Sequence, residues 1–248
     1  MVGRIAAVVM SALRPCRRYT QVMQACVCCG SKGRTTSSVL WPELVSEWRL
    51  SPEEAAYVER QQGFHCISCG SNLRSMVLAK SILDFYGARE PFADFIRDAD
   101  RDLAILEINE AGNLSQFLRL SRGHHLVEFP DVDMTSLPFA TASFDLVVHS
   151  DTLEHVPHPI AGLAECRRVL RKGSACAFTV PIIVGRLTSS RAGLPPSYHL
   201  GGPEKDPRTL VHTEYGADAW THVIRAGFQQ CRITAIDFPA AHCLLGVA

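Results

Sequence analysis

The second half of the chain alternates short apolar runs with segments of helical spacing. Apolar runs at residues 103–108, 124–129, 144–148 and 175–180 predict strands that are buried on both faces of a parallel sheet. Between the last two runs, residues 160–170 carry apolar side chains at helical spacing, and Arg171-Lys172-Gly173 supplies positive charge and a stop. This order predicts an α/β domain with helices on both faces of its sheet.

The remainder of this half has a different pattern. Eight Gly and Pro residues interrupt residues 182–210, which predicts a long loop on the ligand side of the sheet and suggests a substrate cover. A helix is expected over 215–226, ended by Gly227. Residues 228–238 and 241–247 then predict a closing pair of antiparallel strands.

Helical signals also occur in the first half. Ser51-Pro52-Glu53-Glu54 combines an N-cap, a Pro at the first helical position and a following Glu, so a helix is expected to run from there to about Gln62. Apolar residues at helical spacing predict a second helix over 73–86, ended by Gly87, and a shorter one over 91–99. We expect residues 76–99 to link an N-terminal module to the main domain.

Composition narrows the choice of partners. Among 248 residues, 47% are hydrophobic and the formal net charge is zero, so a sizeable core is expected and no overall field draws the chain to nucleic acid. No run approaches the ~20 apolar residues that span a bilayer, and we expect a soluble, cytoplasmic protein without a membrane partner. Residues 1–34 carry six Lys or Arg and no acid, and residues 1–23 are expected to be a disordered basic leader. The sequence does not indicate the oligomeric state.

Ten cysteines are present, and four of them form two similar units. Each unit is a Cys-x-x-Cys-Gly-Ser knuckle, in which the spacing lets two thiolates converge on one ion and the Gly permits a tight turn. Four sulfurs fit a structural, tetrahedral Zn²⁺ site, and residues 24–75 are expected to form its module. A redox dithiol or an iron–sulfur cluster competes with this interpretation, but neither needs the repeated Gly-Ser turn. Cys28 and His65 adjoin the proposed ligands and are expected to be bystanders; the ligands are Cys26, Cys29, Cys66 and Cys69.

Polar residues follow the third of the predicted buried strands, at the edge of the sheet where ligands bind in open α/β folds. The whole stretch from Asp133 to Val156 reads DMTSLPFATASFDLVVHSDTLEHV. Its pattern LPFxxxSFDLVVxSDxLEHV resembles the segment around the fourth strand of class I S-adenosylmethionine (SAM)-dependent methyltransferases of the type 11-like group. The resemblance covers about residues 100–248. It implies a Rossmann-like seven-stranded methyltransferase sheet with helices on both faces, beside a small zinc-ribbon-like module, and SAM as cofactor.

The resemblance also assigns cofactor-binding positions. Glu107 matches the acid after the first strand, whereas Asn109, Ala111 and Asn113 stand where glycines usually occur and Gly112 is out of step. Asn and Ala are the residues that best replace Gly in such a loop. In the resembled family, an acid at the end of the second strand, here Glu128, binds the ribose hydroxyls, and a later acid, here Asp133, reaches the adenine amino group. The expected set is Glu107, Asn109, Ala111, Gly112, Glu128, Asp133, Met134, His149 and Ser150.

The activity expected from this resemblance is methyl transfer to an acceptor that the sequence does not identify, with a small molecule or a glycan precursor favoured. A hydroxyl or amine acceptor needs a base, for which His212, His199 and His155 are the candidates. The main alternative is a binding protein with a degraded cofactor loop whose zinc module recruits a partner. A nicotinamide dehydrogenase lacks support because no GxGxxG follows the first strand. A nucleic-acid modifier lacks the expected basic, aromatic-rich stripe.

Overall fold

The fold is built around a six-stranded, mostly parallel sheet. The computed structural model describes residues 25–98, 100–198 and 206–248. The strand order is β10-β11-β6-β5-β3-β4, with β4, β3, β5 and β6 parallel and β11 antiparallel to both of its neighbours. The strands are β3 (Ile105–Ile108), β4 (His124–Val127), β5 (Phe144–Ser150), β6 (Leu170–Thr179), β10 (Gln230–Ile236) and β11 (Ala241–Val247). The predicted α/β class is therefore confirmed.

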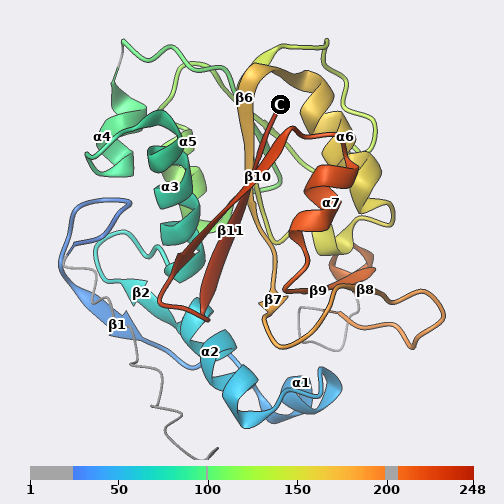
Figure 1. Ribbon diagram of the computed structural model, residues 1–248. Helices are drawn as coiled ribbons and strands as arrows, with labels where there is room; N and C mark the ends of the chain where they lie inside the picture. The colour runs from blue at the N-terminus through green and yellow to red at the C-terminus, as the bar shows by residue number, and fades with distance from the viewer. Residues whose placement is uncertain (1–24, 99, 199–205) are drawn as a thin grey trace, which may run out of the picture.

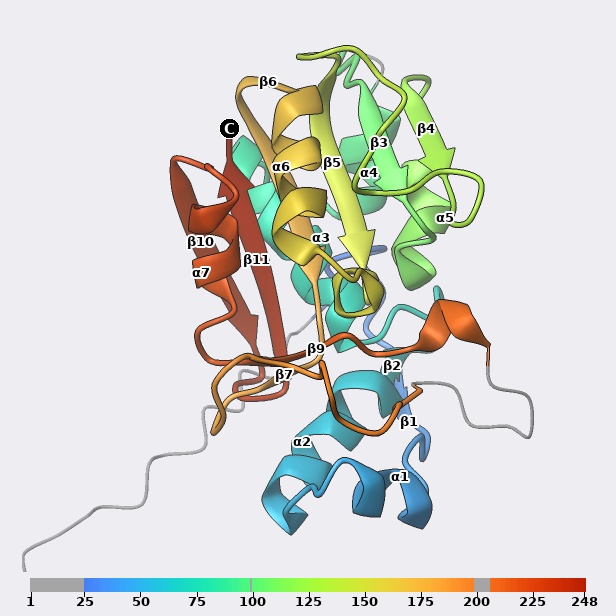
Figure 2. The same ribbon diagram turned by 90° about the vertical axis from the view of Figure 1, so that its right-hand side faces the viewer.

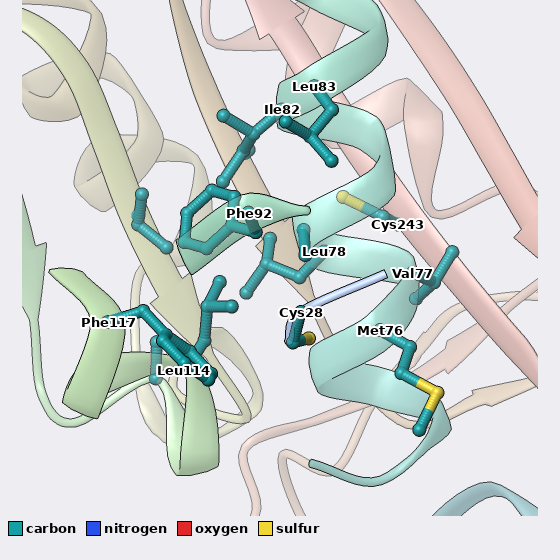
Figure 3. Packing of buried hydrophobic residues seen from close by; sticks show 14 of the residues in the cluster. Cys28, Met76, Val77, Leu78, Ile82, Leu83, Phe92, Leu114, Phe117 and Cys243 are labelled. Atoms are coloured by element: carbon teal, nitrogen blue, oxygen red, sulfur yellow. The ribbon is translucent and has the colours of Figure 1, made fainter. Parts of the chain in front are cut away.

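Helices cover both faces of this sheet (Figure 1). One face carries α3 (Leu73–Tyr86), α4 (Phe92–Arg97) and α5 (Ser115–Leu118), and the other carries α6 (Pro159–Val169) and α7 (Trp220–Arg225). Each face has its own cluster of buried apolar side chains. Figure 3 shows the first cluster, in which Leu78 and Ile82 of α3 lie near Phe92 of α4 and Leu114. The helix expected over 73–86 is thus one of the layers of the fold.

The ends of α3 follow directly from its sequence. Asn72 is the N-cap, and its side-chain oxygen accepts a hydrogen bond from the Ser75 backbone N–H at 3.0 Å. Gly87 ends the helix with a φ of +69°, a left-handed conformation that glycine adopts without steric cost.

The N-terminal module lies at the carboxyl ends of the parallel strands (Figure 2). Its strands β1 (Arg34–Thr36) and β2 (Phe64–Cys66) pair antiparallel, and between them lie α1 (Pro42–Glu47) and α2 (Pro52–Gly63). The predicted start of α2 is confirmed by a complete capping box between Ser51 and Glu54. Buried residues of this module, Cys26, Cys28 and Cys66 among them, belong to the same apolar cluster as α3, so the module and the sheet share a core.

The predicted count of seven strands is wrong for the described residues, in which the sheet has six. β4 is an edge strand, and only residues 128–143 separate its end at Val127 from the start of β5 at Phe144. A parallel crossover alone takes a dozen or more residues, so this connection has no room for a further strand and its return helix.

The helix expected over 215–226 begins later than predicted. Residues Thr213–Gly216 form strand β9, which pairs with β7 (Ile182–Ile183) and β8 (Ser189–Ser190) in a small sheet; α7 starts only at Trp220. Gly216 explains the difference, because a Cβ there would lie 2.2 Å from the Arg186 carbonyl oxygen. This close backbone approach belongs to a paired strand and not to a helix. The expected loop over 182–210 accordingly contains β7, β8 and the 3-10 helix η3 (Pro207–Thr209).

Some expectations fall outside the described part of the chain. The basic leader 1–23, His199 and Ala99 are not among the described residues. Within the described residues, no helix has the length and apolar character needed to cross a membrane.

Candidate functional site

A cavity of about 610 Å³ opens at the carboxyl ends of β3, β4 and β5. The sheet side of the cavity comes from the residues that follow these strands, and the opposite side comes from α1 and the segment around η3. Its volume is in the range of small-molecule and cofactor sites. Polar and aromatic side chains in its lining include Trp41, Trp48, Arg74, Asn109, Glu128, Phe129, Asp133, Asp151, Thr152, His155, Asp206, Arg208 and His212.

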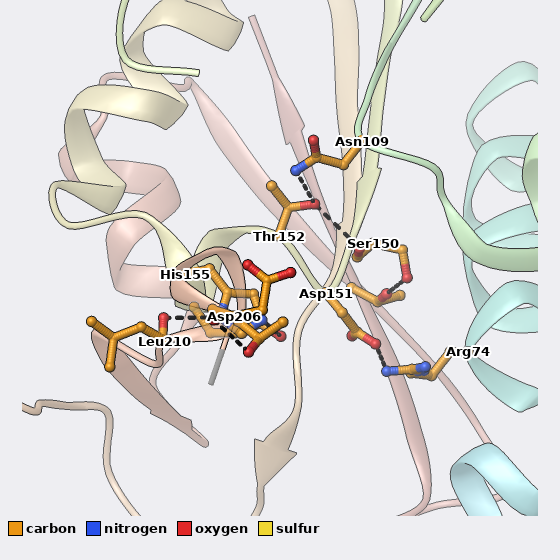
Figure 4. Close-up of polar contacts among 11 residues, drawn as sticks. Arg74, Asn109, Ser150, Asp151, Thr152, His155, Asp206 and Leu210 are labelled. Carbon is orange, nitrogen blue, oxygen red and sulfur yellow. Dashed lines mark hydrogen bonds and ion pairs between the residues drawn. The ribbon is translucent and has the colours of Figure 1, made fainter. Parts of the chain in front are cut away.

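Asn109 connects the ends of the three strands. It has a φ of +52°, and its side-chain oxygen accepts a hydrogen bond from the Phe129 backbone N–H at 3.0 Å. Its amide nitrogen lies 3.5 Å from Thr152 Oγ1 (Figure 4). Asn tolerates positive φ better than other residues with a side chain, so the chain turns here without the expected glycine.

Glu107 shapes the loop from within the protein and is absent from the cavity lining. Its side chain is fully buried, and one carboxylate oxygen accepts the Ala111 backbone N–H at 2.7 Å. The other oxygen accepts the Ser115 hydroxyl at 3.1 Å and lies 2.6 Å from His124 Nε2. Ala111 is buried, and Gly112, with a φ of +53°, also lies outside the lining. These partners give the predicted acid a positioning role that its place in the sequence did not indicate.

Three of the expected cofactor-binding residues, Glu128, Asp133 and Met134, line the cavity. Glu128 and Asp133 are exposed, whereas Met134 is buried with its side chain against Gly162 of α6. Phe129 also lines the cavity with 50% of its surface exposed, and its place in the sequence gave no sign of this role. An exposed ring next to two carboxylates can stack on a flat heterocycle while the carboxylates accept hydrogen bonds.

His149 and Ser150 do not line the cavity, contrary to their expected role. β5 continues to Ser150, two residues beyond the predicted end, so His149 is a fully buried strand residue. Its ring stacks on Phe178 with 4.7 Å between centroids, and Ser150 hydrogen-bonds Thr179. Burial lowers the pKa of His149 to about 3.

The residues that reach the cavity from β5 are Asp151 and Thr152 instead. Asp151 forms an ion pair with Arg74 of α3, and Figure 4 shows the two side chains meeting from opposite elements. Burial lowers the pKa of Arg74 to about 10, which leaves the guanidinium charged at neutral pH. Arg74 lies far from this strand in the sequence, and no local pattern marked it as a site residue.

Two of the three candidate bases line the cavity, and the third, His199, lies outside the described residues. The Nδ1 atom of His155 donates a hydrogen bond to the Leu210 carbonyl oxygen at 3.0 Å, which fixes the ring to the segment after η3 (Figure 4). His212 is half-buried, and its pKa is lowered by this burial and by the nearby His155 and His158. At neutral pH its imidazole is therefore mainly uncharged and able to accept a proton.

The four cysteines of the two knuckles come together as predicted, with all four Sγ atoms within 4.8 Å of one another. Cys26 and Cys69 are 3.8 Å apart at sulfur, and Cys29 and Cys66 are 3.7 Å apart. A tetrahedron with Zn–S bonds of ~2.3 Å has edges of about 3.8 Å, so the donor set fits Zn²⁺. We call Cys26, Cys29, Cys66 and Cys69 the four-cysteine site.

The two knuckles have matching backbones. Gly30 N–H donates to the Cys26 carbonyl and Gly70 N–H donates to the Cys66 carbonyl, with φ values of +76° and +71° at the two glycines. Burial raises the pKa of Cys66, but hydrogen bonds from the backbone N–H groups of Cys69 and Ser68 outweigh it and lower the pKa to about 6. Cys28 is buried elsewhere, with its thiol 3.7 Å from the Ser75 carbonyl oxygen.

A second group of close donor atoms lies in the core. His149, Cys166 and Cys176 are buried between β5, α6 and β6, with their donor atoms within 4.8 Å of one another. These three donors leave a tetrahedral zinc ion one ligand short, and their surroundings are apolar. We therefore treat them as core residues.

Comparisons with known proteins agree with this geometry. Residues 95–178 match the family model described as a methyltransferase domain. The chain is 31% identical over 137 residues to a demethylmenaquinone methyltransferase of Clavibacter sepedonicus, covering 54% of this chain and 48% of that protein. It is 31% identical over 117 residues to an uncharacterized methyltransferase of Mycolicibacterium gilvum, covering 44% and 45% of the two chains. The chain thus spans about half the length of these curated relatives.

Among solved structures, a SAM-dependent methyltransferase from Aquifex aeolicus aligns with 67% of this chain and 86% of its own, at 11% identity and a TM-score of 0.38. The matched family segment 95–178 contains β3, β4, β5 and most of β6. This part of the chain is therefore similar to methyltransferase domains, and it includes the strand ends that form the cavity.

Proposed function

We propose that this protein is a SAM-dependent methyltransferase whose cofactor binds in the cavity at the ends of β3, β4 and β5. The observation that carries the proposal is that Asn109, Glu128 and Asp133, which follow two different strands, line one cavity. The match of residues 95–178 to a methyltransferase domain supports the same conclusion.

The lining suits the parts of SAM. Glu128 would hold the ribose, because a carboxylate accepts two hydrogen bonds from a vicinal diol. Asp133 would accept a hydrogen bond from the adenine amino group, and Phe129 would stack on the base. Asn109 would border the rest of the cofactor at the turn after β3. When bound, SAM supplies an electrophilic methyl group on a positively charged sulfur.

The acceptor is proposed to enter from the side of α1. Trp41, Leu44 and Trp48 line the main cavity and also a neighbouring cavity of about 470 Å³. The neighbouring cavity carries both acids and arginines, including Glu47, which accepts a hydrogen bond from Ser197, and Arg191, which pairs with Glu214. Two tryptophans with flanking polar groups favour a small polyhydroxylated or aromatic acceptor, in keeping with the expected small molecule or glycan precursor.

His212 is the favoured base for an acceptor that must lose a proton. It lines the cavity, and its lowered pKa keeps the ring neutral at the pH where it would work. His155 is held by the Leu210 carbonyl and is proposed to position the segment that covers the cavity. Residues of α1 and of the segment around η3, which form the side of the cavity opposite the sheet, would also exclude water. Methyl transfer by in-line displacement requires this exclusion of water.

Calorimetric titration with SAM and S-adenosylhomocysteine (SAH) tests the proposal. Wild type should bind both, and Glu128→Ala should lose binding without loss of folding. Asp131→Ala is the matched control, because Asp131 is an exposed acid of the same loop that lies outside the lining. Failure of wild type to bind either compound would overturn the proposal and favour the alternative, a methyltransferase-like binding protein.

A further inference from the structure

The two knuckles of the four-cysteine site contact different parts of the fold. The first supports α4, since the Val27 and Cys28 carbonyls accept the backbone N–H groups of Phe92 and Ala93. The second contacts the segment that follows β3. Gln116 donates its side-chain amide to the Cys69 carbonyl at 2.9 Å and to the Asn113 carbonyl at 2.7 Å.

Close packing adds to this hydrogen bond. A Cβ on Gly70 would lie 2.6 Å from the Asn113 amide nitrogen, so the knuckle and the segment touch without a gap. A Cβ on Gly112 would lie 3.6 Å from the Ser75 hydroxyl at the start of α3. The knuckle also leads directly into Arg74, which pairs with Asp151 at the end of β5.

We infer that the four-cysteine site and the cofactor site are energetically coupled through Gln116 and Asn113. A bound metal ion would hold the Cys69 carbonyl and Gly70 in place, and these would support residues 109–116, whose first residue, Asn109, lines the cofactor cavity. The inference rests on the proposed function, because it takes SAM as the ligand of the cavity.

Coupling between two binding sites is reciprocal, so it has two readouts. Filling the metal site should tighten SAH binding, and SAH should slow the release of zinc to a chelator. Both effects should be about five- to twentyfold, within the usual range for coupled sites. Neither readout requires the acceptor or turnover.

The decisive variant is Gln116→Ala in the full, zinc-loaded chain. Gln116 is exposed, so its loss should leave the fold and one zinc ion per chain intact. SAH should bind more weakly, and its effect on the zinc release rate should shrink or disappear. Gln230→Ala is the control, because Gln230 is an exposed glutamine of β10, at the edge of the sheet opposite β4, and lies outside residues 109–116.

A glycine pair gives an independent comparison. Gly30→Ala and Gly70→Ala place a Cβ at similar positive φ, but the first meets Pro91 at 3.3 Å and the second meets Asn113 at 2.6 Å. Only Gly70→Ala should weaken SAH binding more than it weakens zinc binding.

The outcomes separate the two proposals. If wild type binds SAH but zinc release is the same with and without SAH, the coupling is absent and this inference is wrong. The same conclusion follows if Gln116→Ala keeps the full SAH effect. If wild type does not bind SAH at all, the proposed function itself fails.

Discussion

The side-chain oxygen of Asn109 accepts the backbone N–H of Phe129 at 3.0 Å and thereby joins the end of β3 to the end of β4. Asn109 has a φ of +52°, in the left-handed region. Asn109 therefore combines a positive φ, which a glycine would usually supply, with a side-chain hydrogen bond, which a glycine cannot make. Substitutions can separate these two contributions.

Asn109→Gly removes the side-chain hydrogen bonds but suits the backbone, and it should cost about 1 kcal/mol of unfolding free energy. Asn109→Ala removes the same bonds and adds left-handed strain of about 1–2 kcal/mol, so it should be clearly less stable than the glycine variant. Urea denaturation of the three proteins at fixed zinc concentration measures the difference. Equal stability of the two variants would contradict the role of the positive φ.

Glu107 should behave as a residue that positions the loop. Its buried carboxylate accepts hydrogen bonds from Ala111 and Ser115 and lies beside His124. Glu107→Gln should therefore lower the unfolding free energy by about 2–3 kcal/mol, because the buried donors lose a charged acceptor. SAH titration should show weaker binding in proportion to this loss. A variant that keeps full stability but loses SAH binding would instead indicate direct contact with the cofactor.

The cysteine pattern allows a sharp test of the metal site. Cys29 is one of the four grouped sulfurs, whereas its neighbour Cys28 contacts the Ser75 carbonyl. Elemental analysis should find about one zinc ion per chain in wild type and in Cys28→Ala, and much less in Cys29→Ser. Chelation of wild type should lower its melting temperature, since metal binding to the folded site adds to stability. Loss of zinc from both variants alike would argue against the assigned ligands.

His149 should make the protein sensitive to acid. Burial lowers its pKa from 6.5 to about 3, so between these values the unfolded chain binds a proton that the folded chain does not. The stabilising effect of the neutral ring is complete above pH 6.5 and falls by up to about 1.4 kcal/mol per pH unit below it. His149→Phe keeps a ring beside Phe178 and should reduce the fall in urea midpoint between pH 7 and pH 5.

The sequence was most informative where local chemistry decides the structure. The capping box at Ser51, the N- and C-terminal limits of α3 and the twin knuckles all depend on neighbouring residues, and the structure agrees with each. The buried strands could be recognised because a strand of a parallel sheet is buried on both faces and therefore has a short, continuous apolar sequence.

The cavity was harder to predict, because its composition depends on strand ends and on distant partners. β5 ends two residues later than predicted, so His149 lies in the core and Asp151 reaches the cavity. Arg74 and Trp41 enter the lining from elements that precede the sheet in the sequence. Glu107 was recognised as important, but only its three-dimensional partners show that it supports the loop.

The titration of His212 gives the most direct test of the proposed base. Burial comes first among the causes that lower its pKa, followed by the positive charge that His155 and His158 can carry. Its imidazole signals in a pH series of NMR spectra should therefore report a pKa below the ordinary value of 6.5, and His212→Gln identifies them by their loss. His158→Gln removes one of the neighbouring charges and should move the pKa of His212 back toward 6.5. A His212 pKa at or above 6.5 would leave the ring partly protonated at neutral pH, and the role of base would then pass to another group of the cavity.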